Sequence, residues 1–174
     1  MPRPEVRPLL EVSDAVDPAS PGLWWARRAP EPLVGMFAPA AGFPFHLLAD
    51  QQVGAIVSLI GPQAYDTGSL RTYAFSLHDL YQRREPADPV AERVELAAAA
   101  GQVARLLADG VGVAVHCRAG IGRTGTVIGA VLVSLGYSTA DVACWLDAVQ
   151  RARGCRGWPE SPWQLDNLDV LNSS

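Results

Sequence analysis

The sequence has no lysine and only three cysteines, and both scarcities narrow the classes of protein to which it can belong. All fourteen basic residues are arginines, and eighteen acidic residues bring the net charge to −4. A duplex nucleic-acid binder needs a concentrated basic face, so this balance argues against a nucleic-acid partner. The cysteines show no metal-ligand spacing and are odd in number, which argues against a zinc site and a disulfide framework. We therefore expect no metal and no cofactor.

Long apolar segments are also missing. Residues 1–5 lack the apolar core of a signal peptide. The longest apolar run, Val127–Leu135, is too short and too interrupted by glycine to span a bilayer. These absences predict a cytoplasmic protein without a membrane partner. The exclusive use of arginine is typical of GC-rich coding sequences and favours a bacterial source.

The chain does contain enough apolar residues for one core. Hydrophobic residues make up 49% of its 174 residues and charged residues 18%, which is ordinary for a globular domain. Residues 1–32 hold seven of the fourteen prolines and show little periodicity. We predict an extended, proline-rich N-terminal arm over residues 1–32, pinned by Trp24 and Trp25, and a single domain over residues 33–174.

Apolar runs alternate with helix-like segments through this domain. Strands are expected over residues 33–38, 55–60, 73–77 and 111–115. Helices are expected over residues 44–52, 89–109 and 124–135, with two more that begin after Ser138 and Ser161. Such alternation predicts an α/β fold whose central, mostly parallel sheet is flanked by helices.

The segment from His116 to Thr124 reads His-Cys-Arg-Ala-Gly-Ile-Gly-Arg-Thr and joins an expected buried strand to an expected helix. Successive N–H groups of such a loop point inward and form an anion-sized nest at the helix N-terminus. Thiols in that positive field ionise more readily than free thiols, which favours Cys117 as a nucleophile. Arg123 offers two parallel donors that match two oxygens of a tetrahedral oxyanion. The nucleophile Cys117, the anion-binding N–H groups of the loop and the phosphate-binding Arg123, called the phosphate clamp, are thus expected at one phosphate-sized site.

This segment resembles the signature His-Cys-x-x-Gly-x-Gly-Arg-Thr of the cysteine-dependent protein tyrosine phosphatase superfamily, and the short chain resembles its compact dual-specificity branch. The resemblance covers residues 33–171, strongly at the loop and by pattern elsewhere. It implies a metal-independent phosphatase with the fold of that superfamily, which forms a phosphocysteine at Cys117 and acts on phosphorylated proteins or peptides. The alternative is a structural cysteine beside a glycine turn.

Further roles follow around the loop. The substrate phosphate would bind to Arg123 and to the loop amides of Arg118, Ala119, Gly120, Ile121 and Gly122. Thr124 would donate its hydroxyl to the departing sulfur, serve as a helix-start hydroxyl, or do both. His116, by its role in the family, would support Cys117 from behind. The Arg118 side chain would contact substrate or stay in solvent.

The general acid has two candidates. An alkoxide or phenoxide leaving group needs an acid from another loop, which in this family is an aspartate upstream of the cysteine. The family's spacing favours Asp88, but Asp88 precedes Pro89 and is a natural N-cap whose carboxylate backbone N–H groups would occupy. Asp79 directly follows an apolar, strand-like segment, as the acid does in the family. We therefore favour Asp79.

Three residues outside the motif are also notable. Some relatives position the hydrolytic water with a glutamine, and Gln164 stands in a similar context, although Ser161 and Gln164 also form a capping-box pattern. Cys144 is expected in the core. Cys155 is expected to be exposed, and a redox disulfide with Cys117 is a hypothesis that the sequence does not test.

The substrate is less constrained by sequence. No counterpart of the long recognition loop of classical tyrosine phosphatases is evident, which predicts a shallow pocket open to phosphotyrosine and to phosphoserine or phosphothreonine. Ala119 and Ile121 stand where phosphoinositide phosphatases often carry lysines. The acidic net charge does not favour an RNA 5′-triphosphate substrate. The alternative outside enzymology is an inactive phosphate-binding module, against which the intact Cys117 and Arg123 argue.

Overall fold

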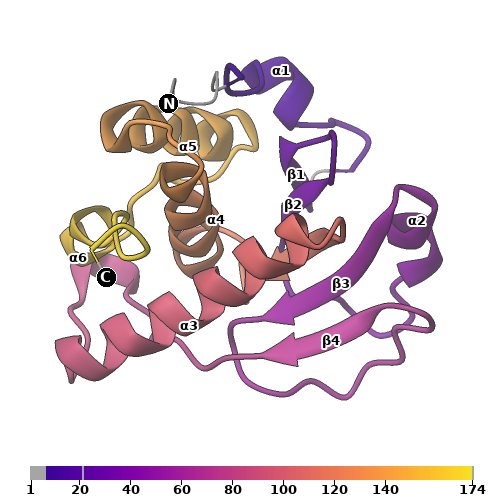
Figure 1. The fold of residues 1–174 in the computed structure, drawn as a ribbon, viewed down its shortest axis with the longest axis horizontal. Helices are drawn as coiled ribbons and strands as arrows, with labels where there is room; N and C mark the ends of the chain where they lie inside the picture. The colour runs from indigo at the N-terminus through magenta and orange to yellow at the C-terminus, as the bar shows by residue number, and fades with distance from the viewer. Residues whose placement is uncertain (1–6, 21, 174) are drawn as a thin grey trace.

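Within residues 7–20 and 22–173, which the computed structural model describes, the chain forms a five-stranded sheet in the order β1-β2-β5-β3-β4 (Figure 1). The strands are β1 (Leu23–Arg27), β2 (Leu33–Met36), β3 (Val53–Ser58), β4 (Arg71–Ala74) and β5 (Gly112–His116). β2, β5, β3 and β4 run parallel, and β1 pairs antiparallel with β2. The predicted α/β fold with a mostly parallel sheet is confirmed.

Helices cover both faces of the sheet. They are α1 (Val12–Ala15), α2 (Phe45–Asp50), α3 (Pro89–Ala108), α4 (Gly122–Ser134), α5 (Thr139–Ala152) and α6 (Pro162–Asp166), with a short 3₁₀ turn, η1 (Tyr81–Arg83). On β3, Ala55 and Val57 face the core shared with α3, α4 and α5, whereas Ile56 faces the smaller core under α2. Burial on both faces explains why this strand is a continuous apolar run in the sequence. In the described ranges no helix combines the length and the apolar character that a bilayer crossing requires.

The parallel strands end at one edge of the sheet. Met36 and Ser58 are both in register with His116, and Ser58 is in register with Ala74. The segments that follow these strands therefore meet at the carboxyl edge, where α/β sheets usually bind their ligands. This register brings the loop after β5 close to the segment after β4.

The predicted N-terminal arm needs a correction. Residues 23–27 are strand β1 of the sheet, so the sheet extends across the predicted boundary at residue 32. The edge of β2 would otherwise leave its ladder groups unpaired, and β1 satisfies them. Trp24 and Trp25 are buried, as predicted, and the Trp24 indole lies against Gly35.

Two smaller expectations also differ. Strand β4 ends at Ala74 instead of continuing to residue 77. Phe75 N–H still donates to the Ser58 carbonyl at 2.8 Å, but beyond it Ser76 makes only an isolated antiparallel bridge with Ile60. Cys144, expected in the core, is exposed. The buried stripe of α5 includes Val142 and Trp145, and a helix advances about 100° per residue, which turns Cys144 away from that stripe.

Helix α3 begins as its sequence predicts. The Asp88 carboxylate accepts hydrogen bonds from Val90 N–H at 3.1 Å and Ala91 N–H at 3.0 Å, and Pro89 is the first helical residue. Asp88 is therefore occupied as the N-cap of α3.

Replacing Asp88 with alanine should lower the free energy of unfolding by about 1 kcal/mol, because two N–H groups at the helix start lose their acceptor. Phosphatase activity should be unchanged. Urea denaturation and steady-state kinetics measure the two effects, with Asp109→Ala, an exposed position at the opposite end of α3, as the control. Loss of activity at unchanged stability would assign the acid role to Asp88.

Candidate active site

The loop between β5 and α4, residues 117–123, is called the phosphate loop below. Its carbonyl groups point outward and are held by donors from other segments. The Arg118 carbonyl accepts from Ala38 N–H at 3.0 Å. The Gly120 carbonyl accepts from Trp24 Nε1 at 3.0 Å and from Arg153 Nη1 at 3.2 Å.

The Gly122 carbonyl is held in the same way. It accepts from Trp158 Nε1 at 3.3 Å and from Thr126 Oγ1 at 2.7 Å. Across a planar trans peptide, a carbonyl and the next N–H point in opposite directions. The outward carbonyls of the loop therefore turn the following N–H groups inward, and in the described part of the chain the N–H groups of residues 118–121 find no protein acceptor. The loop is an anion-sized nest at the N-terminus of α4.

Gly120 is required at the centre of this loop for two reasons. Its φ of +68° lies in the left-handed region that side chains disfavour. A Cβ atom at this position would also lie 2.6 Å from the carbonyl carbon and oxygen of Met36. The close approach to the end of β2 therefore depends on the absence of a side chain.

Cys117 begins the loop and is buried, with a free thiol. Thr124 lies in the first turn of α4, and its hydroxyl is fully buried without a hydrogen-bond partner among the described residues. The expected bond from Thr124 to the Cys117 sulfur is therefore not formed in this structure. A buried hydroxyl without a partner is costly, and here it adjoins the nest that a phosphate would fill.

His116 lies behind the cysteine and is fully buried. Its Nδ1 lies 3.1 Å from the Cys117 carbonyl, which can only accept, so Nδ1 carries the proton. Nε2 then accepts from the Tyr65 hydroxyl at 2.8 Å. Burial lowers the pKa of His116 and raises the pKa of Tyr65 to about 12, so both groups stay neutral near pH 7. No motif marks Tyr65, and only the fold brings it to the site.

Arg123 and Asp79 meet at the opposite side of the loop. Arg123 Nη2 lies 3.2 Å from Asp79 Oδ2, and Arg123 Nη1 donates to the Leu77 carbonyl at 3.4 Å. The Arg123 side chain is 12% exposed and the Asp79 side chain 52%. Of the two acid candidates, the fold thus brings Asp79 to the phosphate loop and leaves Asp88 on α3.

The α5–α6 connection and the first turn of α6 add one polar residue each, Glu160 and Gln164. Gln164 Oε1 accepts from Glu160 N–H at 2.8 Å and from Ser161 N–H at 3.2 Å, which confirms its capping role. A Cβ atom at Gly122 would lie 2.8 Å from Gln164 Nε2 and would collide with the Glu160 carboxylate. Burial and the nearby Asp79 raise the pKa of Glu160, and Arg123 opposes them. Glu160 belongs to the Pro-Glu-Ser-Pro segment before Gln164. Nothing in the sequence shows that its carboxylate lies next to Gly122.

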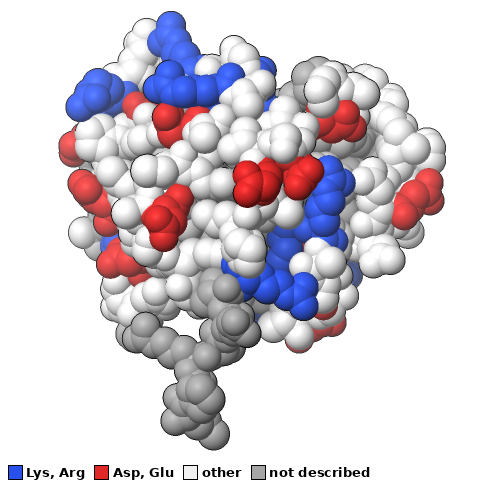
Figure 2. All heavy atoms as spheres, turned by 90° about the horizontal axis from the view of Figure 1, so that it is seen from above, with Lys and Arg blue, Asp and Glu red and all other residues white. Residues whose placement is uncertain are grey.

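The remaining predicted site residues lie along the loop. Arg118 and Ala119 are exposed at its mouth, and Gly120 and Gly122 are buried. Cys155 is partly buried, and its thiol is free. On the face drawn in Figure 2, arginine side chains gather at the upper left and in a short band right of the centre, with acidic side chains near both groups.

The chain has the fold of the tyrosine and dual-specificity phosphatases. The family model described as "Polymorphic toxin system, DSP-PTPase phosphatase" matches residues 34–137, and the chain belongs to this family. Comparison with curated proteins finds no match.

Solved structures share the fold at low sequence identity. TpbA of P. aeruginosa, solved in complex with phosphotyrosine, has 21% identity and a TM-score of 0.62, covering 91% of this chain and 90% of its own. PTPMT1 has 18% identity and a TM-score of 0.59, covering 86% and 94%. The catalytic domain of the PP-IP phosphatase SIW14 of S. cerevisiae has 16% identity and a TM-score of 0.57, covering 84% of each chain. At these identities the likeness shows the fold.

Replacing Gly120 with alanine should abolish turnover and destabilise the protein, because the new Cβ must push the phosphate loop away from Met36. The matched control is Gly68→Ala, whose φ of +62° is similar but where a Cβ would have no atom within 4 Å. The control should lower the free energy of unfolding only by the strain of a left-handed alanine, about 1 kcal/mol, and should keep its activity. Equal effects on urea stability and on turnover in both variants would contradict the importance of the close approach to Met36.

Proposed function

We propose that this protein hydrolyses phosphomonoesters through a phosphocysteine intermediate, with phosphotyrosine proteins as the leading substrate and phosphoserine or phosphothreonine proteins as further ones. The observation that carries the proposal is the contact of Arg123 with Asp79 at 3.2 Å. It joins the expected phosphate clamp and the expected acid at the loop that begins with Cys117.

In the first step, Cys117 gives its thiol proton to solvent, its sulfur attacks phosphorus, and the bond from phosphorus to the ester oxygen breaks. That oxygen takes the proton of Asp79 and leaves as an alcohol or phenol. The non-bridging oxygens stay on the inward N–H groups and on the fork of Arg123, which stabilise the charge of the transition state.

The substrate-free contact between Arg123 and Asp79 supports this order of events. A phosphate that binds the Arg123 fork competes with the Asp79 carboxylate for the same donors. Once displaced, the carboxylate keeps the bond that its Oδ1 accepts from Tyr81 N–H at 3.1 Å, and its Oδ2 is released from Arg123 and can face the leaving-group oxygen.

In the second step, water attacks the phosphocysteine, Asp79 takes its proton, and the sulfur–phosphorus bond breaks to release inorganic phosphate. The unpartnered hydroxyl of Thr124 would donate to the departing sulfur. Gln164 uses its Oε1 as a cap, which leaves its Nε2, on the Gly122 side, as the group that would orient the water.

The substrate assignment rests on the residues of the phosphate loop. The fold is shared by TpbA, solved with phosphotyrosine, by PTPMT1, solved with PI(5)P, and by a PP-IP phosphatase. Ala119 and Ile121 add no positive charge for a second phosphate, which favours a phosphoprotein over an inositide. The net charge of −4 gives no support to an RNA 5′-triphosphate. Three free cysteines favour a reducing, cytoplasmic setting.

Hydrolysis of para-nitrophenyl phosphate tests the nucleophile. Wild-type protein should turn the substrate over in EDTA, because no step uses a metal, and Cys117→Ser should not. Retained binding of a phosphotyrosine peptide by the variant shows that it is folded. If the wild-type protein binds the peptide as the variant does and turns over neither para-nitrophenyl phosphate nor the peptide, the result would favour a phosphate-binding module.

A comparison of leaving groups tests the acid. Asp79→Asn should slow hydrolysis of an alkyl phosphate by about 10²–10⁴-fold and that of para-nitrophenyl phosphate far less, because nitrophenolate leaves without a proton. Asp88→Ala is the matched control and should show no such selectivity. Selectivity in Asp88→Ala instead would overturn the assignment of Asp79.

A further inference from the structure

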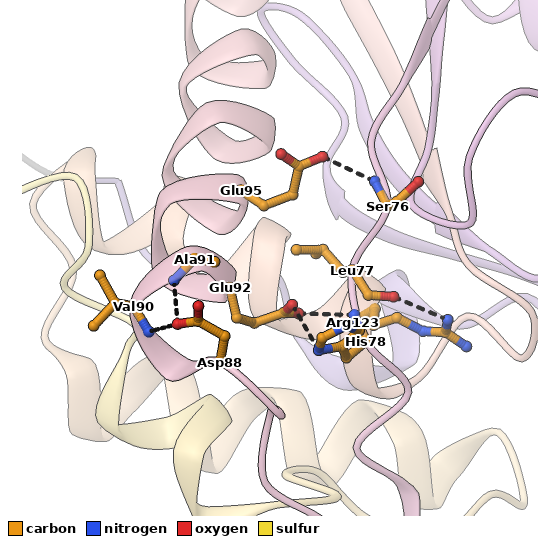
Figure 3. A network of polar contacts seen from close by, with 9 residues as sticks. All are labelled: Ser76, Leu77, His78, Asp88, Val90, Ala91, Glu92, Glu95 and Arg123. Atoms are coloured by element: carbon orange, nitrogen blue, oxygen red, sulfur yellow. Dashed lines mark hydrogen bonds and ion pairs between the residues drawn. The ribbon is translucent and has the colours of Figure 1, made fainter.

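The segment that carries Asp79, residues 76–79, is called the acid segment below. It lies against the first two turns of α3, from which two carboxylates reach toward it (Figure 3). Glu95 Oε1 accepts from Ser76 N–H at 2.9 Å, and Glu92 Oε1 accepts from His78 N–H at 2.8 Å. Side chains of α3 thus satisfy alternate backbone donors of this segment, which lies beyond the end of β4.

Of these two carboxylates, Glu92 is the more deeply buried. It is only 5% exposed, whereas Glu95 is partly exposed. Its second oxygen lies 3.2 Å from Nδ1 of His78, so one residue occupies both oxygens of the carboxylate. Burial raises the pKa of Glu92, and its bond to the His78 N–H and the charge of the His78 ring oppose that rise. A carboxylate is retained in such a site only when its oxygens are well bonded.

The other side of the acid segment is held by Arg123. The guanidinium donates to the Leu77 carbonyl and contacts the Asp79 carboxylate, as Figure 3 shows for the first of these bonds. The peptide unit that joins Leu77 to His78 is therefore held from both sides, by Glu92 of α3 on its N–H and by Arg123 on its carbonyl. When a phosphate takes the Arg123 fork, two contacts remain: the bond from Tyr81 N–H to Asp79 Oδ1 at 3.1 Å, and the bond from His78 N–H to Glu92, which holds the backbone next to Asp79.

We propose that Glu92 is a positioning residue for the general acid: it holds the backbone at His78 so that Asp79 stays at the phosphate loop after Arg123 has turned to the phosphate. The inference rests on the proposed function, in which Asp79 protonates the leaving group. Glu95 binds the backbone three residues before Asp79 and gives the matched comparison, since it anchors the same segment farther from the acid.

The test uses the full chain and two substrates, an alkyl phosphate such as O-phosphoserine in a peptide and para-nitrophenyl phosphate. Glu92→Leu removes both acceptors and should lower kcat for the alkyl phosphate by about 10- to 100-fold, the usual effect of a displaced catalytic group. Turnover of para-nitrophenyl phosphate, whose leaving group needs no proton, should change little. Glu95→Leu should show no selectivity. The double variant Glu92→Leu with Asp79→Asn should be no slower on the alkyl phosphate than Asp79→Asn alone.

Glu92→Gln keeps an acceptor for the His78 N–H and should restore much of the lost rate; it also carries the test if Glu92→Leu does not fold. If a folded Glu92 variant loses kcat equally on both substrates while Asp79→Asn loses it selectively on the alkyl phosphate, Glu92 only stabilises the protein. That result would overturn the positioning role and leave the acid assignment intact. Asp79→Asn without selectivity would instead overturn the acid assignment and, with it, this inference.

Discussion

The site depends on one constraint of the peptide unit. An N–H group can point at a phosphate only if the carbonyl before it points away and finds a donor elsewhere. Around the phosphate loop these donors come from segments far apart in the chain, among them the indoles of Trp24 and Trp158 and the guanidinium of Arg153. Strand β1 and the segment after α5 are therefore part of the machinery that shapes the nest.

The need to pair backbone N–H and carbonyl groups also organises the other half of the site, the acid segment. The acid segment lies beyond β4 and still bridges Ile60 through Ser76, but on its other side side chains take the place of a neighbouring strand. Carboxylates of α3 take its N–H groups, and Arg123 of α4 takes a carbonyl. Arg123 belongs to both halves of the site. Occupation of the phosphate loop and the contacts of Asp79 are therefore linked through this one side chain.

Local patterns accounted for the parts of the site that are local in the chain. The phosphate loop lies within nine consecutive residues, between a strand and a helix that are both strongly apolar. The choice between two aspartates also rested on a local rule, since a residue before Pro89 is a helix cap. Cys144, expected in the core, is exposed because the buried face of α5 is narrower than the helix's apolar pattern.

The sequence alone thus determined the class of fold, the phosphate loop and the residues on it, because short-range periodicity, capping and a contiguous motif encode them. It could not show that Tyr65 donates to Nε2 of His116, that Trp24 on β1 holds the Gly120 carbonyl, or that Glu160 lies against Gly122. Those contacts join residues that are distant in the chain and have no spacing rule between them. Only the register of the parallel strands, which brings their carboxyl ends to one edge, decided which of these side chains would meet.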